Sequence, residues 1–136
     1  MSVEFVDTNV LLYAQEIGAG RKHDKAQELL IRLFAGRTGA LSTQVLTEFY
    51  AAATKKLLMT SLEAEGVIED LGHWRIHRPE VADLIRAAHL QRRYRISWWD
   101  ALIVNSASQL ECRILWSEDF NDGQRYGSLT VRNPFG

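Results

Sequence analysis

Four acidic side chains stand where the surrounding sequence is apolar, so each needs a reason to be there. They are Asp7, Glu48, Asp100 and Asp119. Carboxylates that are crowded together without cationic partners repel each other and lose hydration, and a divalent cation relieves both costs. Such oxygen ligands suit Mg²⁺, with Mn²⁺ as a substitute, and no His or Cys spacing predicts a zinc site. A metal held by these acids would polarise a phosphoryl oxygen and activate a bound water, so the expected chemistry is phosphodiester hydrolysis.

The acids are spread over the chain, so the fold must gather them. Short apolar runs that predict strands alternate with amphipathic stretches that predict helices. Strands are expected at residues 3–6, 40–41, 75–77, 112–116 and 129–131, and helices at 9–15, 23–35, 45–57, from 61 onward, 79–93 and 97–110. This alternation predicts an α/β fold with a parallel sheet and helices on both faces. Ligands of open parallel sheets bind beyond the carboxyl ends of the strands, and all four acids follow or flank such ends.

Each acid also has a local structural explanation. The four alternatives are a helix cap by Asp7, a capping box between Ser97 and Asp100, an ion pair of Glu48 with Lys55, and turn formation by Asp119 and Asp122. Taken singly, these explanations compete well with metal binding. Taken together, four acids that meet at one edge of one sheet favour a metal site.

Bulk properties restrict the class of protein. The 136 residues, 46% hydrophobic and 24% charged, predict one globular domain over residues 1–136 and argue against disorder. No stretch predicts a membrane span or an export signal, and a single cysteine forms no internal disulfide, so a cytoplasmic location is expected.

Positive charge is concentrated in one part of the chain. The formal net charge is −1, yet residues 75–95 carry six arginines and two histidines against two acids. This segment can contact phosphates or form a solvated helix face, and the sequence leaves both interpretations open. The candidate cations for a nucleic-acid substrate are Lys55, Lys56, Arg86, Arg92, Arg93 and Arg95.

Four motifs in order along the chain resemble the PIN-domain family. They are VDTNVLLY at the start, LTEFY in the middle, and WWDALIVNSA and LWSEDFNDG near the end. The closing VRNPF and the chain length resemble bacterial VapC-type toxins in particular. The resemblance implies a three-layer α/β/α sandwich with a mostly parallel five-stranded sheet. It also implies a metal-dependent endoribonuclease, the toxin of a type II toxin–antitoxin system, inhibited by a small antitoxin and usually dimeric.

The family's acids carry over to this sequence as the same four residues. Asp7 and Asp100 are the expected principal Mg²⁺ ligands, while Glu48 binds through water or orients the attacking water. Asp119 completes the cluster or holds a second metal, although Glu118 and Asp122 are neighbouring candidates for this fourth position. The supporting residues, expected to hydrogen-bond the carboxylates or the scissile phosphate, are Thr8, Asn9 and Ser117.

Other functions are weaker. A receiver-type phosphoryl switch needs a lysine at a late strand end, and no lysine follows Lys56. A haloacid-dehalogenase-like phosphatase needs an acid where Asn9 stands. The remaining alternative is a non-catalytic PIN-fold module that binds RNA or protein. Trp98 and Trp99 are candidates for base stacking, with at least one expected in the core, and the apolar helices at 42–58 and 61–74 predict a homodimer surface.

Overall fold

Strands and helices alternate along the computed structural model, which describes residues 2–136. The elements are β1 (Glu4–Val6), α1 (Thr8–Gln15), the 3₁₀ helix η1 (Ile17–Ala19), α2 (Arg21–Gly36), β2 (Gly39–Ser42), α3 (Thr43–Lys56), α4 (Ser61–Leu71), β3 (Arg75–His77), α5 (Val81–Tyr94), α6 (Trp98–Gln109), β4 (Ile114–Trp116), β5 (Arg125–Tyr126) and β6 (Leu129–Arg132). The predicted α/β alternation is therefore confirmed.

The strands form one sheet in the order β3-β2-β1-β4-β6-β5. All neighbouring pairs are parallel except β5 and β6, which pair antiparallel. Because β1 lies at the centre and runs parallel to β2 and β4, the carboxyl ends of these three strands meet at one edge. This edge carries the first and last of the predicted acids.

Two details differ from the sequence-based expectation. The sheet has six strands and not five, because the two-residue β5 pairs with β6 across a turn at Gly127, where φ is +64°. A strand of two residues has no room for the alternating pattern that predicts strands. The fifth α-helix begins at Val81 with Glu80 as its N-cap, so Pro79 lies before the helix and not in its first turn.

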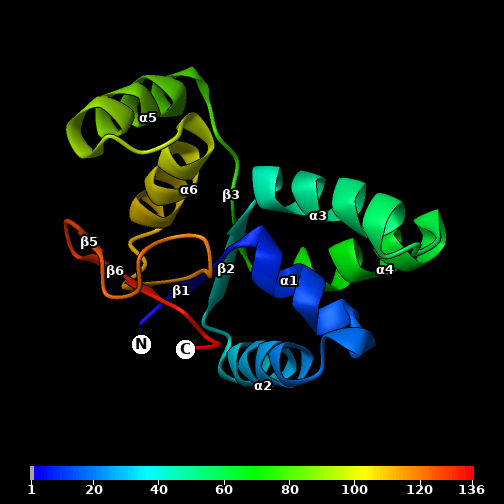
Figure 1. Cartoon of the computed structure of the whole chain (residues 1–136). Coiled ribbons are helices and arrows are strands. Elements are labelled where there is room, and N and C mark those ends of the chain that lie inside the picture. Colours follow the sequence, from blue (N-terminus) through cyan, green and yellow to red (C-terminus); the bar gives the residue numbers. More distant parts are fainter. Residues whose placement is uncertain (1) are drawn as a thin grey trace.

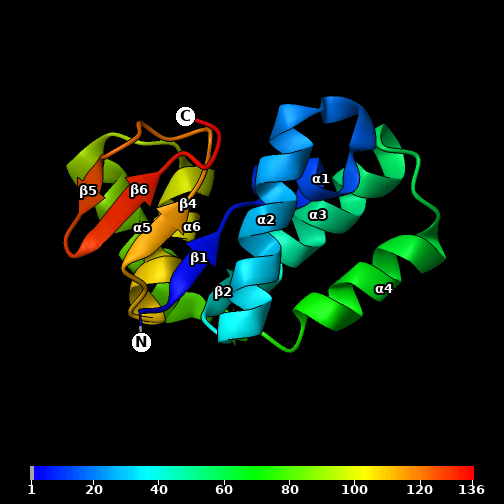
Figure 2. The same ribbon diagram turned by 90° about the horizontal axis from the view of Figure 1, so that it is seen from below.

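Helices cover both faces of the sheet. Helices α5 and α6 lie on one side, and α1 and α2 lie on the other (Figures 1 and 2). Helix α3 continues directly from the end of β2 and packs against α1 and α4. Helices α1 and α3 begin directly after β1 and β2, and α6 ends shortly before β4 begins. The amino ends of these three helices therefore lie near the carboxyl edge of the sheet.

The core lies on both sides of the central strands. Phe5, Val6, Leu41, Leu115 and Val131 are fully buried. Residues 101–107 of α6 are all buried as well, so this helix is enclosed on every side over two turns. The first turn of α6 is thereby held rigidly at the edge of the sheet.

Two further features complete the fold. Cys112 lies in the core just before β4, 2% exposed, and burial raises the pKa of its thiol to about 12. Within residues 2–136, no helix combines the length and apolar character that crossing a lipid bilayer requires.

Candidate active site

Asp7 stands at the end of β1 and serves two purposes there. It is the N-cap of α1, because its Oδ1 accepts a hydrogen bond from Thr8 N at 2.7 Å. Its Oδ2 accepts a second one from Ser117 Oγ, also at 2.7 Å. The side chain is buried, with the residue 7% exposed. Capping and burial at the strand end thus coexist in one residue, and the cap does not exclude a role in chemistry.

Asn9 connects Asp7 to the loop after β4. Its Nδ2 donates to Asp7 Oδ2 at 3.3 Å and to Asp119 Oδ2 at 3.1 Å. Its Oδ1 accepts from Glu118 N at 3.3 Å. Ser117 reinforces the connection, because its Oγ accepts from Asp119 N at 3.1 Å. These supporting residues fix the first and fourth acids relative to one another.

Glu48 reaches the same edge from α3. Its Oε1 accepts from Gln44 Nε2 at 2.7 Å, one helical turn earlier, and its Oε2 lies 3.5 Å from Thr8 Oγ1. The alternative ion pair with Lys55 does not form within residues 2–136. Glu48 therefore faces α1 and not the end of its own helix.

Asp100 lies in the first turn of α6. Ser97 caps this helix, because its Oγ accepts from Asp100 N at 3.1 Å. The reciprocal bond that would complete a capping box is not formed in the described part of the chain. Burial raises the pKa of Asp100, the Ser97 hydroxyl lowers it, and the charge of Asp119 raises it again. The Asp100 carboxylate is therefore close enough to Asp119 to interact with it.

The four acids act on one another electrostatically. Burial raises the pKa of Asp7 to about 6, against hydrogen bonds from Ser117 and Thr8 that lower it, and the charges of Asp119 and Glu48 raise it further. None of the four acids forms an ion pair with a Lys, Arg or His in the part of the chain that the structure describes. Asp119 thus acts on both Asp7 and Asp100, and Glu48 acts on Asp7, with no cationic partner to offset these charges.

The two neighbouring candidates for the fourth position have other partners. Glu118 pairs with Lys22 and accepts a hydrogen bond from Tyr13 Oη at 2.8 Å. Asp122 Oδ1 accepts from Asn133 N at 3.0 Å. Both carboxylates are engaged outside the group of four, which favours Asp119 as the fourth acid.

The donor set suits a hard cation, although the side chains are not gathered around one. Among residues 2–136, no three His, Cys, Asp or Glu side chains stand close enough together to hold a metal ion as they are placed. The Asn9 amide stands between Asp7 and Asp119 and satisfies one oxygen of each. The oxygens present are carboxylate oxygens, which Mg²⁺ and Mn²⁺ prefer, and their mutual repulsion would be relieved by such an ion.

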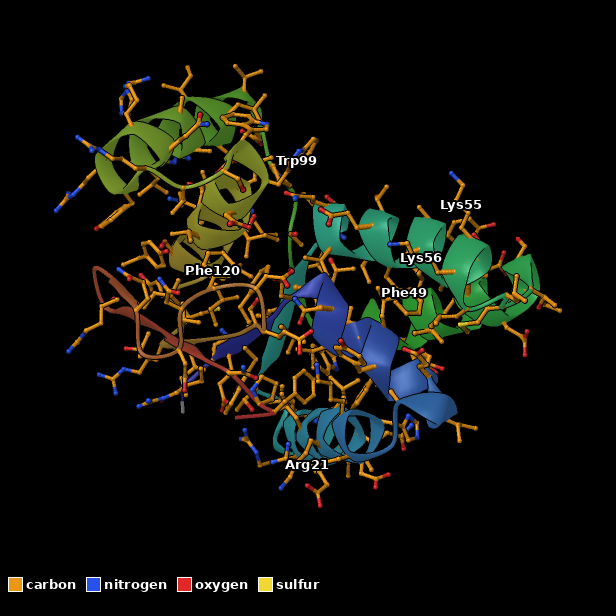
Figure 3. The ribbon with its side chains drawn as sticks, in the orientation of Figure 1. Arg21, Phe49, Lys55, Lys56, Trp99 and Phe120 are labelled. Carbon is orange, nitrogen blue, oxygen red and sulfur yellow. The ribbon has the colours of Figure 1, made fainter. Side chains whose placement is uncertain are left out.

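Two exposed side chains lie beside residues of the site. A cavity of about 260 Å³ is lined by both Asn9 and Lys56. Trp99 lies at the start of α6, directly before Asp100, and is 63% exposed. Figure 3 shows Trp99 projecting toward the side of α3, with Lys55 and Lys56 near the far end of α3.

The remaining predicted cations lie on α5 or just after it. Arg86 contacts Asp83 at 3.4 Å, and the guanidinium of Arg93 lies 5.2 Å from the ring centre of Tyr94. Arg92 stands in the last turn of α5, and Arg95 is the residue that ends this helix in a left-handed conformation. Arg86 and Arg93 therefore already have partners within the chain, which leaves them less available to a ligand at the acids.

Sequence reasoning missed a buried polar network beneath α6. Asp83 is 4% exposed and accepts hydrogen bonds from Glu80 N at 2.7 Å and Asn105 Nδ2 at 3.0 Å. His77, at the end of β3, has Nε2 3.3 Å from Asp83 and Nδ1 2.7 Å from Ser106 Oγ. The network ties β3, α5 and α6 together. The spacing of Glu80 and Asp83, which form a capping box, was the available sequence signal.

The fold and the acids at its edge define the class of protein. The family model of the PIN domain matches residues 5–124. The chain belongs to the PIN-domain family. No curated protein matches it in sequence.

Solved structures share the fold at low sequence identity. A toxin–antitoxin complex from Klebsiella pneumoniae is similar with a TM-score of 0.70 and 21% identity, over 98% of each chain. VapBC2 from Rickettsia felis, bound to a DNA fragment from its promoter, gives 0.70 and 20%, over 96% of this chain and 98% of that one. Mycobacterium tuberculosis VapC20, a toxin that cleaves the sarcin–ricin loop, gives 0.67 and 20%, over 85% and 91%. The fold is thus the one that VapC toxins have.

Proposed function

We propose that this protein is a Mg²⁺-dependent endoribonuclease and the toxin of a type II toxin–antitoxin system. The observation that supports the proposal is the pairwise linkage of four carboxylates from four elements. Asn9 joins Asp7 to Asp119, Thr8 contacts both Asp7 and Glu48, and the charge of Asp119 acts on Asp100. None of the four has a cationic partner in the described part of the chain. Asp7 follows β1, Glu48 lies on α3, Asp100 opens α6 and Asp119 follows β4. The match to the PIN-domain family supports a nuclease, and the similarity to toxin structures supports a toxin.

The surroundings of each acid suggest its proposed role. Asp7 and Asp100 would be the principal ligands. Burial raises the pKa of each carboxyl group, and a bound cation would offset this shift by favouring the charged form. Glu48, held by Gln44, would orient the attacking water. Asp119 would complete the ligand set. When bound, Mg²⁺, or Mn²⁺ in its place, supplies charge neutralisation at the phosphate and a more acidic water.

The supporting residues keep the carboxylates in place. Ser117 donates to Asp7, and Asn9 donates to both Asp7 and Asp119. The backbone N–H of Thr8 donates to Asp7, which caps α1. Fixed donors of this kind reduce the reorganisation that ligand binding requires.

An RNA chain needs positive charge beside an acidic pocket. Lys56 lines the cavity that Asn9 also lines, so it is the best placed of the candidate cations. Lys55, Arg92, Arg93 and Arg95 would add long-range attraction from the ends of α3 and α5, while Arg86 is partly engaged by Asp83.

A small antitoxin and a second copy of the chain are the proposed protein partners. Exposed apolar side chains on and beside α3 and α4 support this, with Leu58 83% exposed and Leu62 76% exposed. A shallow cavity of about 450 Å³ between α3 and α4, lined by Leu46, Tyr50 and Ile68 among others, is the proposed groove for an antitoxin segment. Several of the similar structures are toxin–antitoxin complexes, which supports an antitoxin partner.

One experiment tests the nuclease. Purified protein is incubated with total RNA in Mg²⁺, in Mn²⁺ and in EDTA, alongside Asp7→Asn. We expect cleavage with either metal, none in EDTA, and none by the variant. RNA that is bound but left intact in Mg²⁺ would support the alternative, a non-catalytic PIN-fold binding module. A nuclease that is equally active in EDTA would contradict the metal site.

A further inference from the structure

Trp99 is the large aromatic side chain that the fold leaves in solvent beside the acids. It is 63% exposed, whereas its neighbour Trp98 packs against the small cluster formed by Ala87, Ala101 and Leu102. Exposure of a single apolar side chain is common, and what distinguishes Trp99 is a large aromatic ring directly before Asp100.

The backbone under Trp99 is rigid. Ser97 caps α6, Asp100 is one residue further on, and the helix is enclosed in the core from residue 101 to residue 107. In residues 2–136, Trp99 takes part in no aromatic pair, cation–π contact or side-chain hydrogen bond. The ring therefore stands free on a fixed support, and a flat partner could cover it at little cost in backbone order.

The surroundings of Trp99 suit one kind of partner. The carboxylates, with a metal, would hold a phosphate, and Lys56 supplies positive charge at the cavity that Asn9 also lines. A planar apolar ring beside a phosphate site matches a nucleotide, whose base lies next to its phosphate. The surface proposed for a second copy of this chain lies elsewhere, on and beside α3 and α4, where Leu58 and Leu62 are exposed.

We propose that Trp99 is the stacking platform for one unpaired base of the RNA, next to the bond that is cut. This inference rests on the proposed function and adds a substrate requirement to it, since a base inside a duplex cannot be covered by the indole. Stacking needs a π-face and not a particular hydrogen-bond pattern, so Trp99 would tolerate several bases at that position.

The test compares binding of two RNAs by variants that cannot cleave. In an Asp100→Asn background, a fluorescent single-stranded oligonucleotide and the same oligonucleotide with one abasic position are titrated into protein. We expect Trp99→Ala to weaken binding of the intact RNA about 5- to 150-fold. Trp99→Phe should retain most of the affinity. When the missing base is the one that would stack on Trp99, Trp99→Ala should change the affinity little, because the stacking contact is already absent.

A control variant and a kinetic readout complete the design. Ile31→Ala removes a comparably exposed apolar side chain on α2, 66% exposed, and should leave RNA binding unchanged. In the otherwise native chain, Trp99→Ala should raise KM with kcat nearly unchanged. Binding of the intact RNA by Trp99→Ala as tightly as by the protein that keeps Trp99, together with an unchanged KM, would overturn the inference. So would dissociation of a dimer by Trp99→Ala with RNA binding intact, which would assign the ring to a second copy.

Failure of the inference differs from failure of the proposed function. If the native protein cuts RNA in Mg²⁺ while Trp99→Ala has the native KM, the nuclease stands and the stacking platform does not. If the native protein cuts no RNA, the proposed function fails, and the inference about the cut bond fails with it.

Discussion

Asn9 donates a hydrogen bond to the carboxylate of Asp119 at 3.1 Å, across 110 positions of the sequence. The same amide reaches Asp7 at 3.3 Å. One neutral side chain thus stands between two carboxylates that repel each other, and it holds the end of β1 against the loop after β4. Several expectations for stability and metal binding follow from this arrangement.

Removing the Asn9 amide should make the group of acids dependent on a cation. We expect Asn9→Ala to lower the free energy of unfolding by about 1–2 kcal/mol without metal, because two carboxylates lose a donor. Mg²⁺ should restore more stability to the variant than to the native chain. Urea unfolding with and without Mg²⁺ measures both effects. Asn9→Asp, which adds a like charge, should be worse without metal, and native stability in both variants would contradict the arrangement.

Asp100→Asn and Ser97→Ala separate metal binding from helix capping. Asp100→Asn leaves the backbone N–H that Ser97 accepts, so the cap should survive while Mn²⁺ affinity and cleavage are lost. Ser97→Ala removes the cap and should cost about 1 kcal/mol of stability, with the carboxylate still present. Calorimetric titration of Mn²⁺ and thermal unfolding of both variants give the comparison. A destabilised Asp100→Asn protein with native metal affinity would assign Asp100 to the cap alone.

The raised pKa of Asp7 predicts a pH dependence of stability. The folded pKa of about 6 lies above the ordinary value of 3.8. The folded state therefore holds the proton more tightly, and the contribution of Asp7 to stability is present below pH 4 and is lost as the pH rises to 6. Asp7→Asn, which keeps an N-cap side chain, should gain stability over the native chain across this interval when no metal is added. A difference in Tm that does not change between pH 4 and pH 8 would rule this out.

Asp83 should show the opposite pH dependence. Hydrogen bonds from Glu80 N and then from Asn105 hold the pKa of Asp83 at about 2, below its ordinary 3.8. Its stabilising contribution is therefore present above pH 4 and is lost as the pH falls toward 2. Asp83→Ala should lower the free energy of unfolding by about 2–4 kcal/mol at pH 7. The stability of this variant should also fall less between pH 4 and pH 2 than that of the native chain. Arg86→Ala, which removes a half-exposed partner, should cost less than about 1 kcal/mol.

Removing a cation that contacts RNA should lower the affinity for RNA and leave the affinity for the metal unchanged. Lys56→Ala and the double variant of Arg92 and Arg93 to Ala should weaken RNA binding at all sequences and flatten its salt dependence. Lys56 should have the larger effect per charge, because it lines the cavity beside Asn9. Mn²⁺ affinity should be unchanged in each variant. A native salt slope in the arginine variant would mean that these side chains do not face the substrate.

Local signals predicted the order of elements and the residues at the strand ends. Asp7 interrupts an apolar run, and Asp100 follows a helix-capping serine, so each is visible in a few neighbouring residues. The rule that parallel strands end at one edge was the basis for expecting these acids to lie together. In the structure the charge of Asp119 acts on both Asp7 and Asp100, and the role of these acids in metal binding stays a proposal.

Features that depend on partners distant in the sequence could not be predicted in this way. Strand β5 has two residues and is supported by Tyr126, whose ring packs edge-on against Tyr94 and Phe120. Asp83 lies in a basic segment that the sequence left open as a phosphate-binding or a solvated helix face, and its burial depends on Asn105 and His77 from other elements. In both cases the deciding contacts form only when the layers pack.

The buried thiol of Cys112 has a practical consequence. It is the chain's single cysteine, it is 2% exposed, and its pKa of about 12 leaves almost no thiolate at neutral pH. Alkylating reagents and maleimide dyes should therefore not react with this thiol while the protein is folded. A Leu62→Cys variant would carry one reactive sulfur at an exposed point of α4. A fluorophore or spin label attached there would report on assembly without prior removal of the native cysteine.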